Sequence, residues 1–172
     1  MATLDDEAAV ERLMKESAAI LFPRFYEELQ AASAVRYVAQ ADSLLLRDGT
    51  YFVLESGDEM VACGGWSRRD RLYTGSGARS DDARLLDPRS EPARVRAMFV
   101  RGDWARCGLG RAILERCERD ARAEGFTMLA LMATLPGEPL YRAYGFREIE
   151  RTMVRLPDGT ELAGVAMERP CG

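Results

Sequence analysis

Residues 95–111 have the types and spacing of a phosphate-binding element. An apolar run that ends at Val100 precedes a glycine-bearing stretch and then a long amphipathic segment, an order that predicts strand, loop and helix. The first N–H groups of a helix have no partners within it, and the helix dipole adds partial positive charge there. We therefore expect backbone amides to hold a phosphate or diphosphate, with Gly108 and Gly110 allowing close approach. The loop reads Arg106-Cys107-Gly108-Leu109-Gly110-Arg111.

The spacing separates the known loops of this kind. A Rossmann loop has glycine at its first, third and sixth positions, but the sixth position counted from Gly108 is Ile113. A Walker A loop ends in Gly-Lys-Ser/Thr, and the chain has a single lysine, Lys15, far from the loop. What remains resembles the coenzyme A loop of GNAT acetyltransferases, Gln/Arg-x-x-Gly-x-Gly/Ala, with Ala105 in the first place. The alternative is a strand–helix turn that binds nothing.

A second motif favours the same family. The apolar run 129–132 is followed by Leu140-Tyr141-x-x-x-Gly145-Phe146, which resembles the GNAT motif after the fifth strand. The order and separation of the two motifs match the family. The chain is identified as a member of the GNAT family over residues 50–168, and its N-terminal helices fit less closely.

The resemblance implies transfer of an acetyl group from acetyl-CoA to an amine, by direct attack in a ternary complex. In this family the strand before the loop bulges and splays from its parallel neighbour, and the pantetheine arm lies in that gap. The backbone of Met98 and Val100 would pair with pantetheine, and the Met98 amide would stabilise the oxyanion that forms at the thioester. The implied cofactor contacts are Met98, Phe99, Val100, Arg106, Cys107, Gly108, Leu109, Gly110, Arg111 and Thr134.

Tyr141 occupies the place of the tyrosine that many GNAT enzymes use as general acid toward the leaving thiolate. The alternative is a tyrosine that packs in the core or against the cofactor. Tyr144 is expected to pack beside Gly145 and Phe146. Thr134 stands where the family often has an asparagine that bonds pantetheine, so its hydroxyl would supply that contact.

The general base is not assigned. Arg94 stands where some members carry a glutamate, and the chain has no histidine. A protonated amine must lose a proton before it attacks, so we expect a water chain to a carboxylate. Four carboxylates in or near the segment 67–92 are candidates for this role, but ordinary solvated surface residues would explain their presence equally well. They are Asp81, Asp82, Asp87 and Glu91.

Other functions remain open at this level. A non-catalytic module that binds or senses acyl-CoA is the main alternative, since Ala105, Thr134 and Arg94 depart from the family pattern. A structural domain without a ligand is the third possibility. Aminoglycosides, polyamines, amino acids and protein N-termini are all open as acceptors. Homodimers are common in the family, so a second copy is a partner that the resemblance allows.

Composition sets further bounds. The 172 residues suit a single domain, 1–172, and 47% hydrophobic with 30% charged residues is typical of a globular protein. Apolar runs are too short for a bilayer span, and the acidic start lacks a signal-peptide layout, so we expect a cytoplasmic protein without membrane contact. A net charge of −4 disfavours nucleic acid as a partner.

Four cysteines and no histidine disfavour a metal site, because the cysteine spacings match no zinc motif. Cys63 and Cys117 are expected to be small core residues. Cys107 lies in the loop, with no histidine to activate it.

The pattern of elements predicts an α+β fold with a mixed central sheet of about six to seven strands flanked by helices. Ala9, Leu13, Met14 and Ile20 are expected on one side of the first helix, and Ile113, Cys117 and Ala121 form the buried stripe of the helix after the loop. The segment 67–92 is either a functional loop or a solvated insertion. The expected helices are Asp5–Leu21, Arg24–Ala32, Leu109 to a stop at Gly125, and Gly137–Tyr144; the expected strands are Tyr51–Leu54, Met60–Cys63, Val95–Val100, Thr127–Ala133, Glu148–Leu156 and Glu161–Met167.

Overall fold

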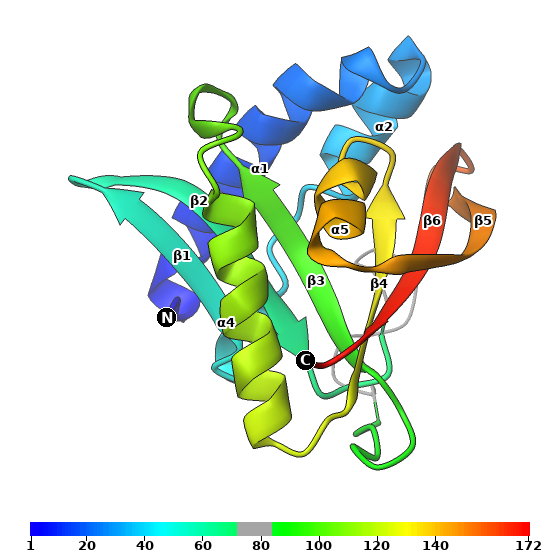
Figure 1. The fold of residues 1–172 in the computed structure, drawn as a ribbon. Helices are drawn as coiled ribbons and strands as arrows, with labels where there is room; N and C mark the ends of the chain where they lie inside the picture. Colours follow the sequence, from blue (N-terminus) through cyan, green and yellow to red (C-terminus); the bar gives the residue numbers. More distant parts are fainter. Residues whose placement is uncertain (72–83) are drawn as a thin grey trace.

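A computed structural model describes residues 1–71 and 84–172, and a six-stranded mixed sheet crosses it in the order β1-β2-β3-β4-β6-β5 (Figure 1). Only β3 and β4 are parallel neighbours; the other adjacent strands are antiparallel. The predicted α+β fold with a mixed sheet is confirmed. The strands are β1 (Tyr51–Ser56), β2 (Glu59–Ser67), β3 (Ala93–Val100), β4 (Met128–Thr134), β5 (Arg147–Arg155) and β6 (Glu161–Pro170). The helices are α1 (Glu7–Leu21), α2 (Glu28–Tyr37), α3 (Ser43–Arg47), α4 (Leu109–Ala123) and α5 (Glu138–Tyr144), with short 3-10 turns η1 (Leu4–Asp6), η2 (Phe22–Arg24) and η4 (Gly102–Trp104).

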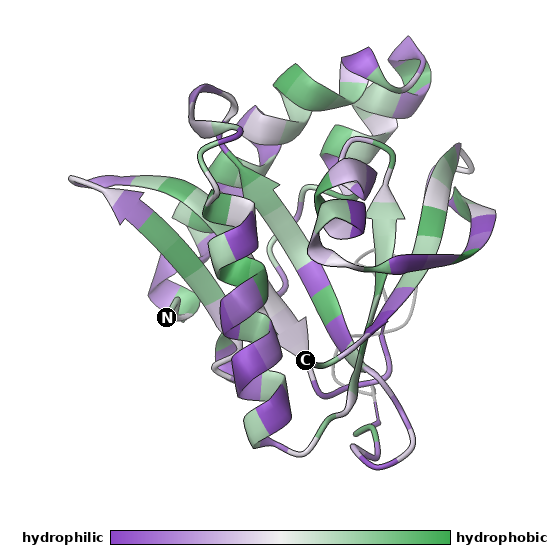
Figure 2. Ribbon diagram, in the orientation of Figure 1, coloured by the Kyte–Doolittle hydropathy of each residue, from purple (hydrophilic) through white to green (hydrophobic). Residues whose placement is uncertain are grey.

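Helices cover both faces of the sheet, and each face has its own apolar core. On one face α4 and α5 pack against the central strands through the predicted stripe of Ile113, Cys117 and Ala121, all buried. Figure 2 shows hydrophilic bands on the side of α4 that faces the viewer and hydrophobic colour over most of β1. Glu118 is not part of this stripe, yet it is also buried.

On the other face α1, α2 and α3 form the second core with β1 and β2. Leu13 and Met14 are buried as expected, but Ile20 is 53% exposed. Ile20 lies in the last turn of α1 beside the η4 turn, where a Cβ on Gly102 would be 3.6 Å from it. The prediction for Ile20 was therefore wrong. Burial raises the pKa of Cys63 to about 12, as expected for a core thiol.

Two N-terminal predictions need correction. The second helix was expected at Arg24–Ala32, but Pro23 lies in η2 and α2 begins only at Glu28. Glu27 precedes the helix, and its backbone N–H donates to the Gln30 side chain at 3.2 Å. The helix α3 was missed altogether. Asp42 caps it by accepting from the backbone N–H of Leu44 at 3.0 Å.

The remaining elements lie within a few residues of their predicted positions. Gly125 ends α4 with a φ of +92°, a conformation that glycine adopts at little cost. The final hairpin turns at residues 157–159, where the N–H of Leu156 donates to the Thr160 carbonyl at 2.8 Å. The first turn leads α4 into β4 and the second brings β6 back along β4, so the chain end lies near the middle of α4 (Figure 1).

Part of the segment 67–92, including Asp81 and Asp82, lies outside the described residues. Its first residues are tied down: Arg68 pairs with Glu124 at 2.5 Å, and Arg69 pairs with Asp48 at 2.8 Å. Among residues 1–71 and 84–172, no helix combines the length and apolar character that crossing a bilayer requires.

Candidate functional site

The loop between β3 and α4 presents a run of unpaired backbone donors. Within the described residues, none of the six N–H groups from Arg106 to Arg111 donates a hydrogen bond to the protein. The first bond at this end of α4 runs from the Ala112 N–H to the Gly108 carbonyl, at 3.0 Å. These donors lie at the positive end of a 15-residue helix. The arrangement suits an anion with several oxygen atoms.

Left-handed backbone shapes this loop. Gly108 has a φ of +82°, and Arg106, which has a Cβ, adopts a φ of +67°. A non-glycine residue in this region is strained, which is a recurrent feature of ligand-binding segments. A Cβ on Gly108 would meet nothing within 4 Å, so this side of the loop is open.

Gly110 has a different reason to be glycine. A Cβ there would be 2.7 Å from the Leu140 side chain. Because Gly110 has no side chain, α4 can approach α5 closely. The N–H of Gly110 remains among the six unpaired donors. Of the two glycines expected to allow close approach of a phosphate, only Gly108 has an open side.

A gap opens between the two parallel strands. β3 and β4 form only two registered pairs, Ala93 with Leu129 and Arg94 with Ala130, both near the start of the strands. Beyond them the strands share no pair, although each continues for several residues. Met98, Phe99 and Val100 therefore lie on the part of β3 that has no partner in β4. The splayed strand pair expected from the resemblance is confirmed.

A β-bulge at Ala97 and Met98 bends β3 at this point. Gly64 of β2 faces both residues, because the register passes from Cys63–Phe99 directly to Gly65–Arg96. Ala97 has a φ of +54°. A bulge turns a strand and disrupts its ladder locally, so it accounts for the divergence of β3 from β4.

Two buried hydroxyl groups hold this irregular backbone from the α1 side of the sheet. Tyr51 donates to the Ala97 carbonyl at 2.7 Å, and Ser17 of α1 donates to the Val100 carbonyl at 2.7 Å. These bonds occupy carbonyl groups that a regular strand would have paired within the sheet. The bulge is therefore a fixed feature of this fold.

Tyr141 lies on α5 at the end of the gap. Its side chain is 9% exposed and makes an edge contact with Phe146, with ring centroids 5.9 Å apart. Among the described residues its hydroxyl bonds no protein group, and it is not one of the fully buried polar atoms that lack a partner. Burial raises the pKa of this hydroxyl above its usual value, so it stays protonated at neutral pH.

Thr134, at the end of β4, is a neighbour of Tyr141. The Cβ position of Gly137 would lie 3.0 Å from the Tyr141 ring and 3.4 Å from the Thr134 Oγ1. The structure thus brings together the loop, the parted strands, Thr134 and Tyr141 at one end of the sheet, the upper end in Figure 1.

Residues 47–148 match the family model described as "Acetyltransferase (GNAT) domain". The chain belongs to the GNAT acetyltransferase family. A search of curated protein sequences gives no match.

Solved structures show the same fold. A GCN5-related N-acetyltransferase from Rhodopseudomonas palustris superposes with a TM-score of 0.72 at 17% identity, covering 97% of this chain and 91% of that one. The PaiA N-acetyltransferase of Thermoplasma acidophilum, solved with coenzyme A, gives 0.66 at 13% identity, covering 98% and 94%. The ribosomal-protein-S18-alanine N-acetyltransferase of Escherichia coli gives 0.57 at 20% identity, covering 98% and 90%. At these identities the likeness concerns the fold.

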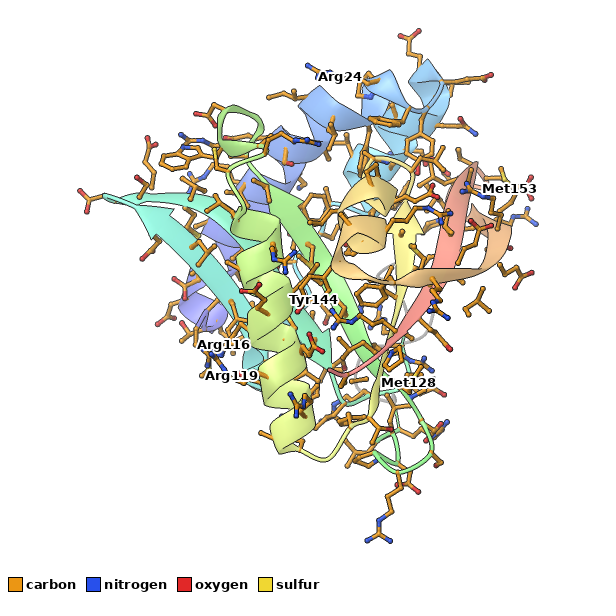
Figure 3. All side chains as sticks on the ribbon, in the orientation of Figure 1. Arg24, Arg116, Arg119, Met128, Tyr144 and Met153 are labelled. Carbon is orange, nitrogen blue, oxygen red and sulfur yellow. The ribbon has the colours of Figure 1, made fainter. Side chains whose placement is uncertain are left out.

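In this GNAT chain Tyr144 has a structural position distinct from that of Tyr141. Its hydroxyl donates to the buried Glu118 carboxylate at 2.5 Å, and Glu118 also accepts from the Gly172 N–H at 2.7 Å. The Arg169 guanidinium stacks on the Tyr144 ring, 4.3 Å from its centroid. Figure 3 labels Tyr144 beside α4, where this network ties α5 and the chain end to that helix.

The two described carboxylates considered as bases lie far from this end of the GNAT fold. Asp87 and Glu91 precede β3, whereas the loop follows it, and the eight-residue strand between them spans about 25 Å. The segment that leads into β3 lies at the lower end of the molecule in Figure 1. Arg84 donates to Glu91 and lowers the pKa of that carboxyl to about 2. Arg94 is at the same lower end and pairs with Asp70 at 3.2 Å.

Several residues that shape the site give no signal in the sequence. Tyr26 accepts from the Leu135 N–H at 2.8 Å and donates to the Ala163 carbonyl at 2.9 Å, which fixes the end of β4. Its burial raises its pKa to about 12. Tyr26 and Ser17 act on backbone more than eighty residues away in the chain. No local motif marks such pairs.

Proposed function

We propose that this GNAT protein transfers an acetyl group from acetyl-CoA to the nitrogen of an amine acceptor, by direct attack within a ternary complex. The observation that carries the proposal is the run of six unpaired amides, Arg106–Arg111, beside a pair of parallel strands that part after two registered pairs. A diphosphate needs donors, and an extended amide-bearing arm needs unpaired strand edges.

The proposed donor site uses the two features separately. The amides of Arg106–Arg111 hold the diphosphate of coenzyme A, aided by the positive end of α4. The backbone of Met98, Phe99 and Val100 pairs with the pantetheine arm, and Thr134 supplies a hydroxyl from the facing strand. The fit rests on the open side of Gly108 and on the absence of β4 partners for this part of β3.

The proposed chemistry joins the acceptor nitrogen to the acetyl carbon and breaks the carbon–sulfur bond. The Met98 N–H stabilises the oxyanion that develops on the acetyl oxygen. Tyr141 donates its proton to the departing sulfur, and the amine nitrogen loses its extra proton to water. Tyr141 suits the acid role because its hydroxyl is protonated at neutral pH and bonds no described group.

The test couples calorimetry to a thiol-release assay. Acetyl-CoA is titrated into the protein, and free thiol is then followed with a panel of amines. We expect saturable binding and amine-dependent release of coenzyme A, with the N-acetylated product identified by mass spectrometry. Absence of acetyl-CoA binding would overturn the proposal. Binding without turnover on any amine would instead favour a non-catalytic acyl-CoA-binding module.

A further inference from the structure

A small apolar recess lies on the α2 side of the sheet, at the end of β4. Its volume is about 50 Å³. The described lining residues come from the segment after α2, from β4, from the end of β5 and the residue that follows it, and from β6. They are Val38, Met132, Ala133, Thr134, Val154, Leu156, Leu162, Ala163 and Gly164.

The recess adjoins the proposed reaction site. Thr134 lines it, and the same residue is the neighbour of Tyr141 across Gly137. Thr134 also pairs with Gly164 of β6, which lines the recess from the adjacent strand. Thr134 therefore belongs both to the lining of the recess and to the surroundings of the proposed acid.

Hydrogen bonds between α2 and the final hairpin hold together the segments that line the recess. Ser33 donates to the Asp158 carboxylate at 2.7 Å, and Gln30 donates to the Glu161 carbonyl at 2.9 Å. Tyr26 donates to Ala163, itself a lining residue. These bonds hold α2 against the hairpin, and Thr134 has the one polar side chain among the described residues that line the recess.

We propose that this recess receives the hydrocarbon part of the acceptor, and that the acceptor is a short aliphatic monoamine. The inference rests on the proposed N-acetyltransferase function. A water-sized group needs roughly 10–15 Å³ of such space, so the recess holds about three to five non-hydrogen atoms. None of the described lining residues is charged. A second ammonium group would lose its hydration there without a counter-charge, which disfavours polyamines and aminoglycosides.

The test measures binding separately from turnover. Primary n-alkylamines from ethylamine to octylamine are titrated calorimetrically into the protein saturated with coenzyme A, which carries no acetyl group to transfer. We expect affinity to rise about fourfold per methylene up to about four or five carbons and then to fall. Spermidine and an alanine-terminated peptide should bind more weakly than butylamine. A flat length profile, or tighter binding of either competitor, would overturn the inference.

Variants sharpen the test by changing the size of the recess. A Cβ on Gly164 would be 3.4 Å from Val154 and 3.1 Å from the Met132 sulfur, so Gly164→Ala should move the optimum to a shorter chain. Val154→Ala enlarges the recess and should move the optimum to a longer chain. Met153→Ala is the matched control. Met153 precedes Val154 in the chain, but its side chain is 50% exposed at the outer edge of the molecule (Figure 3) and does not line the recess.

The two proposals fail in different ways. If Val154→Ala leaves the length optimum unchanged, the recess is not the amine site, whether or not the protein acetylates amines. A shifted optimum without thiol release from acetyl-CoA would establish the recess as an amine site and refute the transferase proposal. Thiol release at equal rates for all chain lengths would support the transferase proposal and refute the recess as the amine site.

Discussion

Replacing Tyr141 with phenylalanine removes one hydroxyl and separates its catalytic role from a packing role. The hydroxyl lies in a 9% exposed side chain and bonds none of the described residues. Its removal therefore costs no hydrogen bond to a described residue. The ring keeps its contact with Phe146. We expect the free energy of unfolding of Tyr141→Phe to stay within about 1 kcal/mol of the wild-type value.

Turnover, in contrast, should fall. Loss of a general acid lowers the rate by roughly 10²–10⁴-fold, and the affinity for acetyl-CoA should be unchanged. Because burial raises the Tyr141 pKa, the wild-type hydroxyl stays protonated through pH 10, and kcat should not decline below that pH for lack of the acid. The assay is thiol release from acetyl-CoA between pH 7 and pH 10, together with unfolding in urea.

Tyr144→Phe is the matched control. It removes a hydroxyl that donates to Glu118, so it should lower stability by about 1–3 kcal/mol and leave turnover near the wild-type value. If kcat of Tyr141→Phe stays within about threefold of the wild-type value, Tyr141 is not the general acid. A stability loss above about 1 kcal/mol in Tyr141→Phe would show that the hydroxyl has a structural bond.

Three further predictions follow from single contacts. Iodoacetamide should label the exposed Cys107 rapidly and the two buried thiols only after unfolding, and coenzyme A at about 100 times its Kd should slow Cys107 labelling roughly 100-fold; equal rates with and without ligand would contradict the loop assignment. Asp42→Asn should lower the free energy of unfolding in urea by about 3–5 kcal/mol, because it removes the carboxylate that pairs with the buried Arg96 at 2.6 Å. A decrease under about 1 kcal/mol, as for an exposed ion pair, would refute this prediction. Gly64→Ala places a Cβ 2.7 Å from the Met98 side chain, so it should destabilise the protein by about 1–3 kcal/mol and weaken acetyl-CoA binding. If calorimetry gives an unchanged affinity for acetyl-CoA, the bulge does not shape the site.

The sequence predicted the elements whose signal is local. The stripe of Ile113, Cys117 and Ala121 defined α4, and Gly125 marked its end, because helical periodicity and a left-handed stop are written in neighbouring residues. The bulge and the parting of β3 from β4 came from the family resemblance. Periodicity alone gives no measure of strand pairing.

What the sequence did not predict depends on contacts between distant segments. Ser17 and Tyr26 hold backbone far away in the chain, and Glu118 is buried only because Tyr144 and the chain end cover it. Gly110 was expected to allow close approach of a phosphate, but Leu140 occupies the space where a Cβ of Gly110 would point. Each of these outcomes depends on how separate elements pack, which residue types alone do not encode.

A crystal structure of the protein with acetyl-CoA tests the central claim most directly. We predict the diphosphate within hydrogen-bond distance of the amides of Arg106–Arg111, the pantetheine arm along Met98–Val100, and the thioester near Tyr141. A ligand bound elsewhere, or β3 and β4 paired along their full length with the loop amides bonded within the protein, would contradict it.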